Sequence, residues 1–178
     1  MAGQMLVEPV PSASVLVLRD DPFELLLLRR GETSSFVPNA WVFPGGVADP
    51  GDGGDLRTTA VRETFEEAGL TLDPQSLVAT SRWITPVGLP KRFDTLFFLA
   101  RVARDVDVTI DGHEITESMW IAPADALARR DLKLVFPTIK NLEAIAGFTS
   151  VEALLASRRG TVIEPVLPVL VNGKPTLP

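Results

Sequence analysis

Apolar residues recur along the chain with two different spacings, which separate expected strands from expected helices. The run Leu25–Leu28 has no polar alternation, which is typical of a strand buried on both faces. It belongs to the second of two expected strands, at residues 15–18 and 24–29, joined by a turn at 20–22. Further strands are expected over residues 41–43, 77–86, 93–102 and 117–121. The strand at 41–43 ends in Pro44-Gly45-Gly46.

Helical spacing appears first at residues 56–68, after a turn-rich stretch that contains three glycines. Asp55 is placed to cap this helix, and Gly69 is placed to end it in the left-handed conformation. Its expected apolar side consists of Ala60, Val61, Thr64, Phe65 and Ala68. Further helices are expected over residues 123–130, 137–146 and 151–158. Strands interleaved with helices predict an α/β layer structure around a mixed sheet.

Proline content and loss of pattern divide the chain into three parts. Residues 1–12 are interpreted as an N-terminal lead-in, 13–158 as one domain and 159–178 as a proline-rich tail. In the tail, Asn172-Gly173 is a hairpin signal. The apolar segment Val166–Val171 would pack either on the edge of the chain's own sheet or on a second subunit.

Composition narrows the possible partners. With a net charge of −6 and a pI of about 4.8, the chain lacks the basic surface that a nucleic-acid polymer requires. It contains no cysteine, which excludes disulfides and thiolate metal sites and fits a reducing cytoplasm. The apolar runs are too short to span a membrane, and the N-terminus lacks the basic region of a signal peptide. We therefore expect a cytoplasmic protein with no membrane partner.

Candidate chemistry is concentrated in the helix over 56–68. Glu63, Glu66 and Glu67 have the spacing i, i+3 and i+4, which places their carboxylates within about 100° of arc on one helix face. Like charges at this spacing destabilise a helix by roughly 0.2–0.5 kcal/mol per pair. The cluster is therefore either a solvated face or a cation site. Hard oxygen ligands suit Mg²⁺ or Mn²⁺, and these ions act on phosphates.

The residues around this cluster favour the cation site. Gly45 and Gly46 allow the backbone to approach a ligand closely and leave carbonyl oxygens available. Arg62 lies one residue from the acidic arc and can orient a carboxylate. A metal ion would also allow an acidic chain to bind a small molecule that carries phosphate.

The segment R-E-x-x-E-E-x-G-L at 62–70, with its upstream glycines, resembles the signature G-x5-E-x7-R-E-U-x-E-E-x-G-U of the Nudix hydrolase superfamily, where U is aliphatic. The likeness extends over about residues 13–146 and includes Trp120–Pro123 before an expected helix. It implies an α/β/α sandwich around a mixed β-sheet. The implied reaction is hydrolysis of a nucleoside diphosphate linked to another group, with Mg²⁺ or Mn²⁺ as cofactor.

Matching to the signature implies roles for individual residues. Glu63, Glu66, Glu67 and the Gly46 carbonyl would bind the metal, and Arg62 would orient Glu63. A further acid from a later loop is expected as ligand or general base, with Glu117 ahead of Glu114. Catalysis is thus assigned to Arg62, Glu63, Glu67 and Glu117. The candidates for substrate binding are Arg29, Phe43 and Arg92, although Arg92 could equally be a surface charge of a hairpin.

The sequence departs from the signature at three points. Asp52 replaces the first glutamate, nine residues rather than seven separate it from Arg62, and Thr64 occupies an aliphatic position. The resemblance implies that the first acid braces the loop, so Asp52 puts this brace in question and not the metal site. We expect the longer loop to bulge around Gly53-Gly54.

The substrate is less sharply defined. F-P-G-G-V-A-D at 43–49 is similar to coenzyme A diphosphatases, and residues 90–98 resemble the branch of the mammalian peroxisomal enzyme, although an L-R-x-H element is missing. Coenzyme A or acyl-coenzyme A is the leading prediction, with ADP-ribose, NADH and nucleoside triphosphates as alternatives. A sensor or scaffold that binds a nucleotide without cleaving it, and a chance match to the signature, also stay open. The resemblance further implies a homodimer.

Overall fold

The computed structural model describes residues 7–178 and contains a mixed sheet of eight strands. The strands of this sheet are β1 (Val10–Arg19), β2 (Glu24–Arg30), β3 (Trp41–Val42), β4 (Gly45–Val47), β5 (Val78–Ile84), β6 (Phe93–Arg101), β7 (Ile115–Ile121) and β8 (Pro165–Val166). A separate two-stranded sheet consists of β9 (Val169–Val171) and β10 (Lys174–Thr176). The α-helices are α1 (Leu56–Ala68), α2 (Pro123–Ala128), α3 (Phe136–Ile145) and α4 (Val151–Arg158). Two 3-10 turns lie at Pro50–Asp52 and Pro74–Ser76.

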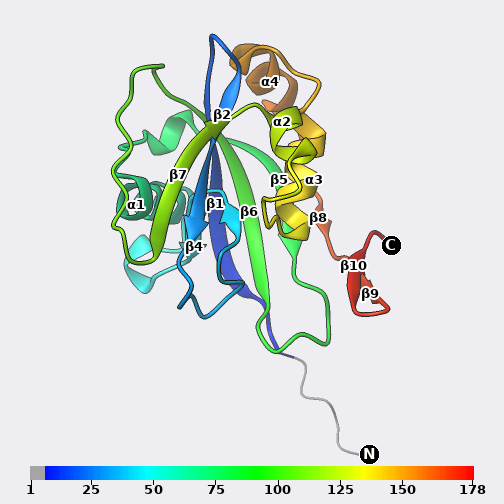
Figure 1. Ribbon diagram of the computed structural model, residues 1–178. Helices are drawn as coiled ribbons and strands as arrows, with labels where there is room; N and C mark the ends of the chain where they lie inside the picture. Colours follow the sequence, from blue (N-terminus) through cyan, green and yellow to red (C-terminus); the bar gives the residue numbers. More distant parts are fainter. Residues whose placement is uncertain (1–6) are drawn as a thin grey trace, which may run out of the picture.

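The helices cover both faces of the sheet, with α1 on one side and α2, α3 and α4 on the other (Figure 1). Leu25 and Leu27 of β2 pack into the core beneath α3 and α4, whereas Leu26 and Leu28 pack into the core beneath α1. All four leucines are completely buried, which confirms that the unalternated run is a strand covered on both faces. The α/β/α sandwich is therefore confirmed.

The sheet has the order β3-β2-β1-β6-β5-β8, with β7 paired to β2 and β4 paired to β1. It is mixed because β1 is parallel to β6 and β5 is parallel to β8, while the other pairs are antiparallel. The sequence did not predict β4. Its Gly45 pairs with Ser14, and a Cβ at Gly45 would lie 2.4 Å from the Ala13 carbonyl oxygen, so only glycine fits this close approach.

Helix α1 has the bounds that the sequence predicts. The Asp55 side chain accepts a hydrogen bond from the Arg57 N–H, and Gly69 ends the helix with φ of 68°. Phe65 was expected on the buried side but is 58% exposed. At 100° per residue it lies about 140° around the helix from the buried Ala60, beyond the core-facing stripe. Thr59 is buried in that stripe instead.

The C-terminal segment decides between the two expected positions of the apolar tail, on the chain's own sheet or on a second subunit. β8 pairs in parallel with β5, so the start of the apolar tail segment packs on the edge of the chain's own sheet. Asn172 and Gly173 connect β9 to β10 with φ values of 51° and 74°, which confirms the hairpin. At the other end, β1 begins at Val10, inside the expected lead-in, and residues 1–6 lie outside the described part.

The domain boundaries and the homodimer stay predictions. Within residues 7–178, none of the helices combines the length and the apolar content that crossing a membrane requires.

Candidate active site

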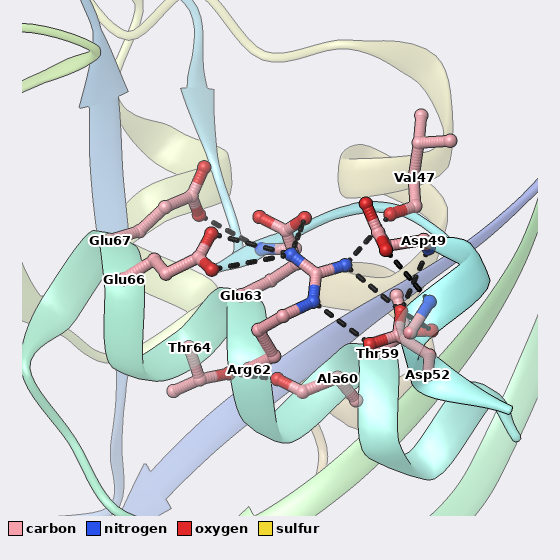
Figure 2. A network of polar contacts seen from close by, with 12 residues as sticks. Val47, Asp49, Asp52, Thr59, Ala60, Arg62, Glu63, Thr64, Glu66 and Glu67 are labelled. Atoms are coloured by element: carbon pink, nitrogen blue, oxygen red, sulfur yellow. Dashed lines mark hydrogen bonds and ion pairs between the residues drawn. The ribbon is translucent and has the colours of Figure 1, made fainter.

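Asp52 anchors the loop that precedes α1. Its side chain is buried, at 5% exposure, and accepts hydrogen bonds from the Thr59 hydroxyl at 2.7 Å and the Asp49 N–H at 2.9 Å. Arg62 donates to both of its oxygens, from Nε at 2.9 Å and from Nη2 at 3.0 Å (Figure 2). Asp52 therefore braces the loop in the position where the signature has glutamate. The extra loop residues bulge as expected, because Gly53 and Gly54 have positive φ and open space around them.

The guanidinium of Arg62 is the centre of the polar network in Figure 2. Besides Asp52, it contacts Glu63 at 2.8 Å, Glu66 at 3.3 Å and the Val47 carbonyl oxygen at 3.0 Å. These bonds raise the pKa of Arg62 further above its already high ordinary value, chiefly through Asp52. The same contact is the main reason that the pKa of Asp52 lies well below its usual range. One cation thus orients three carboxylates.

Glu63 lies directly against Gly46. A Cβ placed on Gly46 would come within 2.5 to 2.7 Å of the Glu63 carboxylate atoms, so the missing side chain leaves the space that this carboxylate occupies. Burial raises the pKa of Glu63, and the bond from Arg62 opposes that shift. Because Glu63 and Gly46 are adjacent, the structure places two of the expected metal donors side by side.

Glu67 is the most enclosed carboxylate of the cluster. It accepts a hydrogen bond from the Gly45 N–H at 2.9 Å, which ties α1 to β4. Burial raises its pKa to about 8, and the neighbouring Glu63 charge raises it as well, while Arg30 opposes the shift. A buried carboxylate with a like-charged neighbour is stabilised in its ionised form by a nearby cation.

The donor set fits a hard divalent cation. It comprises the carboxylates of Glu63, Glu66 and Glu67 together with the Gly46 carbonyl, all oxygens, as Mg²⁺ and Mn²⁺ require. Among the described residues, no three His, Cys, Asp or Glu side chains already form a group that could hold a metal ion. Glu66 is exposed and held by Arg62. The carboxylates must therefore move closer together to bind one ion.

Glu117, the preferred late acid, lies on the wrong face of the sheet. It pairs in β7 with Arg29 of β2 and forms an ion pair with it. Two residues along β7, Met119 packs into the core beneath α3 and α4, so Glu117 faces that side and not α1. Glu114, just before β7, instead acts electrostatically on both Glu63 and Glu67. Of the two expected late acids, Glu114 is therefore the one whose charge acts on the acidic helix.

Of the three expected substrate contacts, the structure brings one to a cavity. The Arg29 guanidinium binds Glu117 and the Asn39 side chain on the face opposite α1. Arg92 is 8% exposed and donates to the backbone oxygens of Thr85, at 3.0 Å, and Val7, at 2.7 Å. Its charge serves chain packing and is not available to a phosphate. Phe43 lines the cavity beside the glycine pair.

This cavity has a volume of about 410 Å³ and reaches Gly45 and Gly46. Its wall is mostly apolar and includes Phe36, Phe43, Trp83, Leu89, Phe93 and Phe136. Such a lining is typical of small-molecule sites, in which a few polar groups fix the orientation of the ligand. The cavity and the acidic helix therefore share the two glycines of β4.

Among residues 7–178, Arg30 is the only charged side chain that lines the cavity. It donates to the Phe36 carbonyl oxygen at 2.6 Å, and burial lowers its pKa while Glu67 and Glu114 oppose that shift. Sequence reasoning missed it in favour of Arg29. As neighbours on one strand, the two arginines must point to opposite faces, but only the structure shows that Arg30 shares the face of Leu26 and Leu28 toward α1.

An α/β/α sandwich with this arginine-centred carboxylate cluster defines a Nudix-type domain. The family model described as the NUDIX domain matches residues 8–142, which is well over half of the chain. The chain belongs to the Nudix hydrolase family.

The relatives that the chain resembles are named for different substrates. The chain is 30% identical to bovine (Bos taurus) m7GpppN-mRNA hydrolase NUDT17 over 64% of its own length and 41% of the relative. It is 26% identical to Xenopus laevis acyl-coenzyme A diphosphatase NUDT19, over 59% and 54% of the two lengths. A crystal structure of a Nudix hydrolase from Alicyclobacillus acidocaldarius matches 84% of this chain and 96% of that one, with 27% identity and a TM-score of 0.76. The chain spans about half the length of the curated relatives it matches.

Proposed function

We propose that this protein is a Mg²⁺- or Mn²⁺-dependent hydrolase that cleaves the pyrophosphate bond of a nucleoside diphosphate linked to another group. The observation that carries the proposal is the position of Glu63 and Glu67 against Gly45 and Gly46 at the edge of the cavity. A diphosphate between the two regions would have its phosphates beside the carboxylate cluster and its organic part against apolar side chains.

In the proposed reaction, a displacement at phosphorus, each residue of the site has its own role. Water attacks one phosphorus, a new P–O bond forms, and the anhydride P–O bond breaks as the second phosphate leaves. A bound divalent ion neutralises the charge that develops on the phosphate oxygens. Glu63, Glu66, Glu67 and the Gly46 carbonyl would hold that ion, and Arg62 holds Glu63 in place. Glu114 would be the acid that accepts the proton of the attacking water, which its electrostatic effect on Glu63 and Glu67 supports.

Arg30 has a separate role in this proposal. Its guanidinium lies between the acidic helix and the cavity, because it is influenced by Glu67 and also lines the cavity wall. A charge at this junction would bind the phosphate that bears the organic group. Arg30 thus replaces Arg29 and Arg92 as the candidate for phosphate binding.

Coenzyme A or acyl-coenzyme A is the leading substrate. Support comes from the segment F-P-G-G-V-A-D at 43–49, from the apolar cavity beside it, and from similarity to the Xenopus acyl-coenzyme A diphosphatase. Because the chain is also similar to an m7GpppN-mRNA hydrolase, a capped dinucleotide is a further candidate substrate that the test must include. ADP-ribose, NADH and nucleoside triphosphates complete the set of candidates.

A substrate panel with mass-resolved products tests this proposal. The wild-type protein and the variants Glu66→Gln and Glu67→Gln are incubated with each candidate and with Mg²⁺ or Mn²⁺. We expect products from at least one diphosphate with the wild-type protein, and a loss of about 100-fold or more in both variants. Turnover that survives both substitutions would exclude the mechanism. Thermal stabilisation by a nucleotide without any product would instead support the sensor.

A further inference from the structure

The C-terminal segment supplies part of the cavity wall, although it lies beyond the family match. That match ends at residue 142, whereas Pro168 and Pro175 both line the cavity. These prolines lie just before β9 and within β10. The cavity therefore combines a part that the family match covers with a part that lies beyond that match.

Two sets of contacts hold the C-terminal strands β8, β9 and β10 in position. β8 pairs in parallel with β5, with Val166 opposite Trp83, and β9 and β10 follow directly as a hairpin beside that sheet edge (Figure 1). The side chain of Leu170 in β9 lies 3.9 Å from the position of a Cβ on Gly88. Gly88 precedes Leu89, which also lines the cavity. The hairpin and the β5–β6 loop thus enclose the cavity from the same side.

The two sides of β9 differ in exposure. Leu170 is partly buried against the β5–β6 loop, while its neighbours Val169 and Val171 are 47% and 50% exposed. Alternation along the strand accounts for this difference, because successive side chains point to opposite faces. The inner face of the hairpin is therefore distinct from its outer face.

Trp83, which lines the cavity, carries a hydrogen-bond donor without a partner. The indole Nε1–H of Trp83 is buried and is the one buried side-chain nitrogen or oxygen of residues 7–178 that has no hydrogen-bond partner. A buried donor without a partner costs about 1–3 kcal/mol. A ligand with an acceptor group at this place would remove that cost.

We propose that β8, β9 and β10 form a wall that determines specificity, and that this wall covers the organic group linked to the diphosphate. The group that it selects is uncharged and apolar, with a hydrogen-bond acceptor within reach of the Trp83 indole N–H. This inference rests on the proposed function for its substrate but makes a claim about binding that is measurable on its own.

Leu170→Asp and Val171→Asp test the wall as a matched pair. Both place one negative charge on β9, the first on its inner face and the second on its outer face. For the substrate found by the panel, we expect Leu170→Asp to raise KM about tenfold or more with little change in kcat, since a buried charge would disrupt the packing of the hairpin on the β5–β6 loop and so open the cavity wall. Val171→Asp should leave both constants near the wild-type values.

A binding probe separates the two proposals. 1-Anilinonaphthalene-8-sulfonate has an apolar aromatic body and one anionic group, which suit the cavity and Arg30, and its fluorescence reports binding without metal or turnover. We expect Leu170→Asp to weaken its affinity about tenfold, and Val171→Asp to leave it unchanged. The wall hypothesis fails if the two variants do not differ in probe affinity. An inactive wild-type protein would contradict the proposed function but leave this comparison intact.

Trp83→Phe provides a variant outside the hairpin. It keeps an aromatic ring but removes the unpaired donor, so it should raise KM for a substrate with an acceptor and leave the affinity of the probe unchanged. An unchanged KM would overturn the role assigned to the indole N–H. Thermal melting of every variant establishes that each is folded.

Discussion

The acidic helix and the apolar cavity meet at Gly45 and Gly46, but they are built in different ways. The acidic site comes from the nearly continuous segment 45–67, and Arg62 links three of its carboxylates. The cavity wall comes from strands β1 to β6, the start of α3 and the C-terminal hairpin. Its side chains are brought together by the tertiary fold alone. The expected metal ligands are thus encoded locally, whereas the late acid Glu114 and the recognition of the organic group depend on segments far apart in the sequence.

This contrast predicts different kinetic effects in the two regions. Substitutions in the acidic site should lower kcat, because they remove charge or misplace a carboxylate. Substitutions in the cavity should raise KM, because they remove apolar contact with the bound organic group.

The largest effect is expected at Glu67, with Glu117 as the matched control. Glu67→Gln removes the enclosed carboxylate beside Gly45 and should lower kcat about 100-fold or more. Glu117→Gln makes the same chemical change on the opposite face of the sheet and should alter kcat less than about threefold. Steady-state kinetics of both variants on one substrate provide the measurement. Equal losses would show that Glu117 acts in the site.

Gly46→Ala tests the contact between β4 and α1. The new methyl group would collide with the Glu63 carboxylate, and a displacement of about 1 Å can cost about 100-fold in rate. Gly147→Ala is the control, because Gly147 has open space around it and no positive φ. We expect a large loss of kcat in the first variant alone. A fully active Gly46→Ala protein would contradict the arrangement of Glu63 and Gly46.

Arg30→Met and Arg29→Met compare neighbouring arginines on opposite faces of β2. A lost charge-assisted hydrogen bond to phosphate costs about 1.5–3 kcal/mol, so Arg30→Met should lower kcat/KM by about tenfold or more. Arg29→Met removes an ion pair that is partly exposed and does not line the cavity, and should have little effect. The reverse order of effects would restore Arg29 as the phosphate ligand.

The smallest effect on activity is expected at Asp52, where the main change is in stability. Asp52→Asn should lower the melting temperature at pH 7 by several degrees, because it weakens the bonds to Arg62 and Thr59. Since folding lowers the pKa of Asp52, its contribution is present above the unfolded pKa of about 4 and is lost as the pH falls below it. Thermal melts should therefore show a smaller difference from the wild-type protein at pH 3 than at pH 7. A difference that grows in acid would contradict the brace.

Local sequence signals predicted much of the fold and of the acidic cluster. Asp55 and Gly69 set the bounds of α1, because capping and helix termination depend on a few adjacent residues. Strand β4 was missed because its pairing with β1 joins residues about thirty positions apart and because glycines carry no strand signal. Phe65 was assigned to the core side because the apolar stripe was taken to be wider than it is.

For the remaining candidates, membership of the site depends on which face of the sheet the side chain occupies. In β2 the four consecutive leucines hide the alternation that separates Arg29 from Arg30. The pairing with β7 also shifts register between these two arginines, which no local pattern reveals. Glu117 was preferred to Glu114 for the same reason, since the sequence did not show which side of β7 faces α1. The contribution of Pro168 and Pro175 to the cavity likewise required the tertiary structure.

The most direct test of the account is anomalous diffraction from crystals of the protein with Mn²⁺ and a non-hydrolysable diphosphate analogue. We expect an anomalous peak bonded to carboxylate oxygens of α1 and to the Gly46 carbonyl, with the carboxylates drawn together around the ion. An ordered analogue with no anomalous signal beside these carboxylates would contradict the claim that the cluster binds a catalytic metal.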